Sequence, residues 1–429
     1  MRLPRMLAGV AVASVLLAAC GTNGGGGGNA NKGTIKIGVD LPESGAETSN
    51  GIPTLNGVKF AVSQVKSVDG FTLEVFNLDD AVNGVHDPQK GAQNVQQFVD
   101  DTKVLGVIGP FNSGVARAEI PITNRAHLVQ ISPANTNQCL TKNIYIPQSL
   151  SGQPDVDCKA AGLPAPADLR PSSPNNYFRV ATTDDNQGPA NSDYLFNTLK
   201  LTKVGVASDA EAYGKGIADT FSTRFQKDGG QVVKRQDFPN ASHVSDFKPF
   251  LRSALAAGAQ AIYFGGTDSN NACVVRQQMK GIFPDAAPFL GGDGIVTAQC
   301  IKDASDKAVG MYGTVATVAA EKVPGAQSTI SAFKSAYPNA SDYGAYTMPA
   351  YDCAKILIQA IDKAIKANNG NMPSRSQVLS QMANVDYTGV LGHTSFDQNG
   401  DTTNKVITIY TVKDATTGWE VESTVNVSS

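Results

Sequence analysis

Runs of basic residues are missing from this sequence, and charged residues are scarce overall. They make up 17% of the 429 residues, and the formal net charge is −3. A protein that binds DNA or RNA through the phosphate backbone usually presents a cluster of Lys and Arg. We therefore expect no nucleic-acid partner.

Motifs typical of metal centres and active sites are missing as well. The six Cys include no C-x-x-C pair, there is no H-E-x-x-H, and the four His are scattered, at His86, His127, His243 and His393. Neither the G-x-S-x-G of a hydrolase nor a phosphate-binding P-loop occurs. We expect no metal, no cofactor and no catalytic residue, which favours a binding protein over an enzyme.

The N-terminus has the pattern of an export signal. Arg2 and Arg5 precede an apolar stretch that is short for a membrane-spanning helix, and LAAC follows at 17–20. This order resembles the bacterial lipobox. The resemblance implies that residues 1–20 are a lipoprotein leader and that Cys20 is acylated. An ordinary cleaved leader with an incidental Cys is the alternative.

Export determines where the protein would act. The lipid on Cys20 would anchor it to the outer face of the cell membrane or on the periplasmic side of a membrane. GTNGGGGGNANKG at 21–33 is rich in Gly, which predicts a flexible tether between the lipid and the folded part.

The remaining cysteines would meet an oxidising environment after export. Cys139 and Cys158 bracket a stretch rich in Pro, Ser and Asn, which predicts a disulfide that stabilises by about 3 kcal/mol. Cys273 and Cys300 each open an expected helix after a strand and could also pair. Cys353 lies on the apolar side of an expected helix, which predicts a buried free thiol.

Strands and helices alternate along most of the chain. Strands are expected at 35–41, 71–80, 104–109 and 128–133, with helices at 56–67, 87–101 and 114–126 between them. A loop over 138–176 interrupts the pattern, which then restarts with strands at 203–209, 231–238, 261–266, 288–293 and 310–316. The pattern predicts an α/β fold with two lobes, each built on a parallel sheet.

The C-terminal part has a different pattern. After two helices, the segment 392–412 and the segment GWEVES at 418–423 are expected to form hairpin strands, with a turn at Asn399 and Gly400.

Two loops at strand ends are suited to hold an anion. Ser113 follows the strand at 104–109 and opens a helix, and SPANTN at 132–137 follows the next strand. Ligands of open α/β sheets bind at such strand ends, where helix N-termini offer unpaired N–H groups. The alternative is that Ser113 and Thr136 only cap helices.

A series of short motifs points to one family. The chain contains, in this order, IKIGV at 35, DPQKG at 87, VIGPFNSG at 107, ISPANTN at 131, FRVATTDDNQGP at 178, AYGKG at 212, IYFGG at 262, FLGGDG at 289 and SFDQNGD at 395. The series resembles the branched-chain amino-acid binding proteins of bacterial ABC importers. It covers nearly all of the chain after the tether.

The resemblance implies the type I periplasmic binding protein fold, in which three crossovers join two doubly wound lobes around a ligand cleft. Lobe 1 would comprise residues 34–180 and 318–391, and lobe 2 residues 181–317 and 392–429, with 138–176 as an extra loop. The crossovers would lie near Tyr177–Thr182, Val315–Thr317 and Leu391–Ser395.

The resemblance also implies ligand-binding positions. Ser113, Ala134 and Thr136 would bind the α-carboxylate and ammonium of an amino acid with backbone help, and Asp293 would pair with the ammonium. Tyr213 would reach across the closed cleft. A buried zwitterion needs such partners, because unpaired charges are costly to bury.

Some positions depart from the family pattern. The segments 42–51 and 267–271 are polar where the family often has aromatics, and Asn112 and Asn135 flank the expected carboxylate site. We therefore expect a branched-chain amino acid or a more polar relative as ligand, an ABC permease as partner, and a monomer. A receptor for an amide, urea or aromatic acid, or a sensory binding protein, is the alternative.

Overall fold

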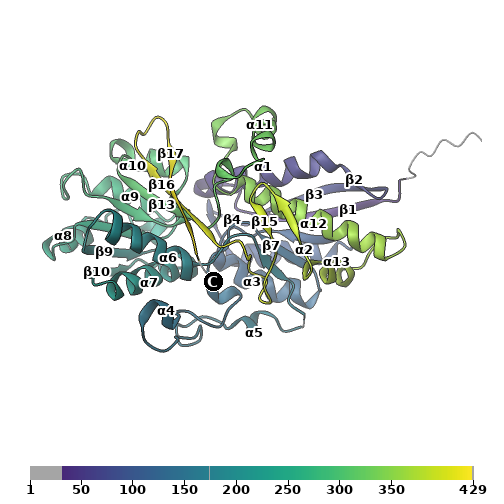
Figure 1. The fold of residues 1–429 in the computed structure, drawn as a ribbon, viewed down its shortest axis with the longest axis horizontal. Coiled ribbons are helices and arrows are strands. Elements are labelled where there is room, and N and C mark those ends of the chain that lie inside the picture. Colours follow the sequence, from purple (N-terminus) through teal and green to yellow (C-terminus); the bar gives the residue numbers. More distant parts are fainter. Residues whose placement is uncertain (1–30, 173, 428–429) are drawn as a thin grey trace, which may run out of the picture.

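The computed structural model describes residues 31–172 and 174–427, so the expected leader, Cys20 and most of the tether lie outside the described residues. Figure 1 shows two α/β bodies side by side. We call them lobe 1, built on a six-stranded sheet, and lobe 2, built on a seven-stranded sheet.

The sheet of lobe 1 has the strand order β2-β3-β1-β6-β7-β8, and every neighbouring pair is parallel except β2 and β3. Its strands are β1 (Thr34–Leu41), β2 (Ser67–Val68), β3 (Phe71–Asp79), β6 (Val104–Ile108), β7 (Val129–Ser132) and β8 (Tyr177–Arg179). The helices of lobe 1 are α1 (Thr48–Val65), α2 (Pro88–Asp100), α3 (Ser113–Arg125), α11 (Gln327–Ala336), α12 (Thr347–Ala367) and α13 (Arg375–Met382).

Helices cover both faces of this sheet. Gly106 of β6 lies against Leu357 of α12, while Val107 packs with Phe98 of α2 on the opposite face. All five residues of β6 are buried, as expected for a central parallel strand.

The sheet of lobe 2 has the order β10-β9-β11-β12-β13-β16-β17. Strand β16 runs antiparallel to both of its neighbours, β13 and β17. Its strands are β9 (Lys203–Ser208), β10 (Gln231–Asp237), β11 (Ala261–Gly265), β12 (Phe289–Gly291), β13 (Met311–Val315), β16 (Val406–Val412) and β17 (Trp419–Asn426). Its helices are α6 (Asp184–Asp193), α7 (Ala212–Lys227), α8 (Lys248–Ala256), α9 (Ala272–Gln278) and α10 (Ala298–Ala304). The two parallel-dominated sheets confirm the predicted α/β class.

The chain enters lobe 2 after β8, leaves it after β13, and returns between β15 and β16. The remaining described strands form two small hairpins outside these sheets. They are β4 (Ala81–Val82) with β5 (Val85–His86), and β14 (Tyr387–Gly389) with β15 (Gly392–Thr394).

The prediction of hairpin strands over 392–412 with a turn at Asn399 and Gly400 is confirmed at the turn, which an antiparallel bridge between Phe396 and Thr402 closes, but not along the whole segment. Strand β15 ends at Thr394, and β16 begins only at Val406. Between them Asp401 pairs with the guanidinium of Arg179, at 2.7 Å, and forms a bridge with the end of β8. The ion pair therefore holds this segment against lobe 1 before it joins the sheet of lobe 2.

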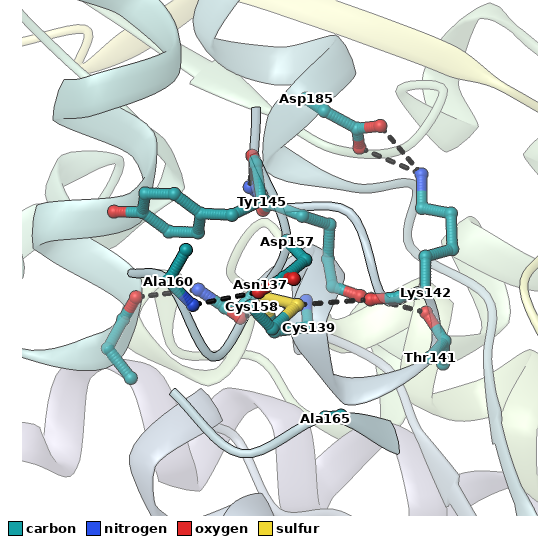
Figure 2. The surroundings of a disulfide bond; sticks show 12 residues. Asn137, Cys139, Thr141, Lys142, Tyr145, Asp157, Cys158, Ala160, Ala165 and Asp185 are labelled. Carbon is teal, nitrogen blue, oxygen red and sulfur yellow. Dashed lines mark hydrogen bonds and ion pairs between the residues drawn. A yellow bond between two sulfur atoms is a disulfide. The ribbon is translucent and has the colours of Figure 1, made fainter. Parts of the chain in front are cut away.

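The segment 138–176 contains two short helices, α4 (Gln148–Ser151) and α5 (Pro166–Leu169), and a disulfide between Cys139 and Cys158 (Figure 2). Side chains near this disulfide reach lobe 2, because Lys142 pairs with Asp185 at 2.7 Å. The segment thus connects the two lobes along one edge.

The other described cysteines lie in the lobes. Cys273 and Cys300 form a disulfide within lobe 2, with their Cα atoms 5.2 Å apart. Cys353 is buried in α12 and forms no disulfide with another described cysteine. Within residues 31–172 and 174–427, none of the helices has the length and hydropathy required to cross a membrane.

Candidate ligand-binding site

A small, largely filled pocket of about 10 Å³ lies between the lobes. Lobe 1 and lobe 2 both contribute, through Phe111, Asn112, Ser113, Gly114, Ala134, Thr136, Glu211, Tyr213, Thr267, Asp293 and Gly294. The structure therefore brings together Asn112, Ser113, Ala134, Thr136, Tyr213 and Asp293, which the sequence proposed as ligand-binding residues.

Asn135, the remaining proposed residue, does not line the pocket. Its buried amide donates to the carbonyl of Phe111 at 2.7 Å and accepts from the hydroxyl of Tyr177 at 2.7 Å. Both ends of the side chain are used within lobe 1, so Asn135 shapes the loop that carries Ala134 and Thr136.

The N-terminus of α3 forms the lobe 1 side of the pocket. Its N-cap residue, Asn112, makes no side-chain hydrogen bond to the first turn. The amide oxygen of Asn112 and the hydroxyl of Thr136 are buried without a partner among the described residues. A helix N-terminus carries a partial positive charge and unpaired N–H groups, so this side of the pocket is suited to a carboxylate.

Asp293, after β12, forms the lobe 2 side. One carboxylate oxygen accepts hydrogen bonds from Tyr213 at 2.7 Å and from Gln187 at 2.8 Å, and the other accepts from Tyr346 at 2.7 Å. Burial raises the pKa of Asp293, and these three donors act in the opposite direction. The carboxylate is thus held in one position at the pocket wall.

The tyrosine that crosses the cleft is not the expected one. Tyr213 belongs to α7 and bonds to Asp293 and Gly294 of its own lobe. Tyr346, which precedes α12 of lobe 1, makes the bond across the cleft. Sequence reasoning missed Tyr346, which lies in none of the quoted motifs, and Gln187, which lies in FRVATTDDNQGP but eight residues after the end of β8.

A second chain of polar contacts crosses the cleft beside the pocket. His86 of lobe 1 lies 2.7 Å from Glu47 of its own lobe and 2.7 Å from Glu211 of lobe 2, one carboxylate at each ring nitrogen. Burial opposes a charge on His86, but the two carboxylates outweigh it and raise the pKa of His86 well above its ordinary value. The imidazolium form therefore joins the lobes.

The polar segments 42–51 and 267–271 contact each other across the cleft. Ser49 and Asn50 donate to the carboxylate of Asp268, at 3.0 and 3.2 Å. Of these two segments only Thr267 lines the pocket. The polar residues expected in the pocket wall therefore serve mainly to hold the closed lobes together.

One group of described carboxylates, Asp40, Asp80 and Glu119, has the spacing of metal ligands, with oxygens within 4.8 Å of one another. All three are buried in lobe 1 and none lines the pocket. Burial raises the pKa of each of them, that of Glu119 to about 8. The protonated, neutral form is therefore favoured. The sequence pattern did not indicate this group.

Comparison with known proteins places the chain in a family. Residues 34–417 match the family described as periplasmic binding protein. An amino acid binding protein of Pseudomonas aeruginosa is 25% identical over 86% of this chain and 87% of its own length. A leucine-, isoleucine-, valine-, threonine- and alanine-binding protein of the same species is 27% identical over 89% of this chain and 91% of its own.

The fold comparison agrees. The crystal structure of the leucine-binding protein LivK from Thermotoga maritima aligns with a TM-score of 0.74 and 23% identity, over 92% of this chain and 99% of that one. The match to the family spans nearly the whole described chain and includes both lobes. This chain belongs to the periplasmic binding protein family.

Proposed function

We propose that this protein captures an amino acid between its lobes and delivers it to an ABC permease. The observation that carries the proposal is the pairing of opposite charges across one pocket. The uncapped N-terminus of α3 lies on one side, and the carboxylate of Asp293 lies on the other. An amino acid has a carboxylate and an ammonium group that match these two ends.

The proposed contacts follow from the polar atoms of the pocket: Thr136 has no partner among the described residues, and the hydroxyl of Ser113, which accepts from the N–H of Asn137 at 3.3 Å, can still donate. Ser113, Thr136 and the first N–H groups of α3 would hold the ligand carboxylate, with Asn112 beside them. Asp293 would hold the ammonium, which would also favour the ionised form of this buried carboxyl. Both charges would then be paired, as burial requires.

The polarity of the pocket lining indicates which ligand side chains fit. Phe111, Ala134 and Tyr213 provide apolar surface, but Asn112, Thr136 and Thr267 are polar. The lining supports a branched-chain amino acid or a more polar relative, and the relative that binds threonine and alanine agrees with this range.

Delivery would depend on lobe closure outside the cytoplasm. The contacts of Tyr346 and His86 across the cleft belong to a closed form, which a permease could distinguish from the open form. We further propose that lipidated Cys20 anchors the protein, that it acts as a monomer, and that it releases its ligand unchanged.

Calorimetric titration of ligand-free protein with the twenty amino acids tests the proposal. At least one should bind, and Asp293→Asn should weaken that binding by about tenfold to a hundredfold, because a charge-assisted hydrogen bond contributes about 1.5 to 3 kcal/mol. Asp285→Asn is the matched control, since Asp285 is exposed, lies outside the pocket lining and pairs with Lys307.

Absence of binding by every amino acid would overturn the proposal. A receptor for an amide, a urea or an aromatic acid would instead bind such a compound with an affinity that Asp293→Asn leaves nearly unchanged. That result would support the alternative ligand class on the same fold.

A further inference from the structure

A second and larger space adjoins the pocket between the lobes. It has a volume of about 710 Å³ and is open to solvent. Its lining includes Arg117 of α3, Lys215 of α7 and Tyr145 of the segment 138–176. We call this space the groove.

The pocket and the groove share two lining residues, Gly114 and Glu211. At Gly114 a Cβ atom would meet no heavy atom within 4 Å, so the space beside this residue is open. The carboxylate of Glu211 is already engaged, because one oxygen bonds to His86 at 2.7 Å and the other accepts from Asn270 at 3.0 Å. A ligand side chain that leaves the pocket past Gly114 would therefore enter the groove.

Arg117 is the charged group of the groove that lacks a partner. Lys215 pairs with Asp219 at 2.5 Å, and His86 lies between two carboxylates. Within residues 31–172 and 174–427, Arg117 has no ion pair or side-chain hydrogen bond, although its side chain is half-buried. Burial without a counter-charge lowers the pKa of its guanidinium. A half-buried cation of this kind favours an anion beside it.

Arg117 lines the groove and not the pocket, so a ligand whose backbone lies in the pocket needs an extended side chain to reach it. Arg117 lies four residues after Ser113 on α3, so the two residues share one helix face and are separated by about 6 Å along the axis. An anionic group that reaches Arg117 while the backbone carboxylate stays at Ser113 must lie several bonds from the α-carbon. Glutamate has about this length, and 2-aminoadipate is one methylene longer.

We propose that the groove is a subsite for a negatively charged side chain, so that the ligand is an acidic amino acid of at least glutamate length. The inference rests on the proposed amino-acid binding at Asp293 and the N-terminus of α3. The side-chain carboxylate would accept hydrogen bonds from the Arg117 guanidinium, a geometry in which two parallel bonds can form.

Calorimetric titration with charged and neutral ligands of equal size tests the subsite. The ligand-free protein should bind L-glutamate or L-2-aminoadipate more tightly than L-glutamine and L-aspartate. Arg117→Gln should weaken glutamate binding by about tenfold to a hundredfold and leave glutamine binding nearly unchanged, because only the charged ligand loses its partner. Arg117→Lys keeps the charge and should retain most of the preference for glutamate.

Arg252→Gln is the control, since Arg252 is exposed on α8 and the substitution changes the net charge equally. An unchanged ratio of glutamate to glutamine affinity in Arg117→Gln would overturn the subsite. If neutral amino acids then still bind and depend on Asp293, the proposed function stands without the subsite. If the unmodified protein binds no amino acid at all, both proposals fail.

Discussion

At the scale of single residues, Arg179 has an unusual role for a fully buried charge. Its guanidinium pairs with Asp401 at 2.7 Å and donates to the carbonyl oxygens of Asn135 and Asn137, at 3.2 and 2.8 Å. Burial opposes ionisation of Asp401, but the charge of Arg179 outweighs it and lowers the pKa of Asp401. Arg179 thus fixes both the loop that carries Thr136 and the segment that returns to lobe 2.

Replacing Arg179 should therefore be strongly destabilising. Arg179→Met removes the charged partner of the buried Asp401 carboxylate, which keeps only the bond from Thr141 among the described residues, and the donor to two carbonyl groups. The free energy of unfolding should fall by about 3 to 5 kcal/mol. Urea denaturation followed by circular dichroism measures this loss. The exposed Arg252→Met should change stability by less than about 0.5 kcal/mol. If Arg179→Met lowers the free energy of unfolding no more than Arg252→Met does, the ion pair contributes little to stability.

At the scale of elements, the segment 138–176 is long and has little regular structure. It is attached to lobe 1 by Leu140 and Leu169, which pack with Ile120 of α3. Its attachment to lobe 2 is polar, through Lys142 and through Tyr145, whose hydroxyl donates to Asp219 at 2.7 Å. The disulfide lies in a small apolar cluster with Tyr145 and Ile146, so the cross-link and this cluster together order the segment.

The disulfide of this segment should contribute measurably to stability. The double substitution Cys139→Ser and Cys158→Ser should lower the free energy of unfolding by about 3 kcal/mol, since the cross-link closes a loop of 19 residues. Hydrogen exchange should increase mainly within 138–176. The matched pair Cys273→Ser and Cys300→Ser should increase exchange in α9 and α10 instead. Exchange that increases in neither region would contradict the expected role of these bonds.

At the scale of the whole molecule, the bond between His86 and Glu211 couples lobe closure to pH. His86 contacts Glu47 and Glu211 directly, and Asp80 and Asp209 are the other carboxyls whose titration its charge affects. Closure brings Glu211 to His86, so the pKa of His86 should be higher in the closed form than in the open form. Protonated His86 therefore favours closure.

The sign of the pH effect follows from this shift. The contribution of His86 to closure is complete below the pKa of His86 in the open form and is lost as the pH rises through the higher value of the closed form. Affinity for the amino acid should consequently fall on the alkaline side, and His86→Gln should flatten this part of the profile. Calorimetry from about pH 6 upwards measures both profiles. A steep alkaline decrease that persists in His86→Gln would assign the effect to another group.

The sequence by itself determined the α/β class and the loops that form the pocket. Strands that alternate with helices form parallel sheets, and the carboxyl ends of parallel strands meet at one edge. For this reason Ser113 and Thr136, which follow neighbouring strands of lobe 1, could be placed together from their positions in the chain. The resemblance to a known family supplied Asp293 of the other lobe.

Only the tertiary structure decided how the lobes meet. Tyr346 reaches Asp293, His86 reaches Glu211, and Arg117 has no counter-charge among the described residues. These relations depend on the relative placement of two bodies that are joined by three short crossings. Hydrophobic periodicity reports which side of each element is buried within its own lobe, but it carries no information about which polar side chains face each other across a cleft.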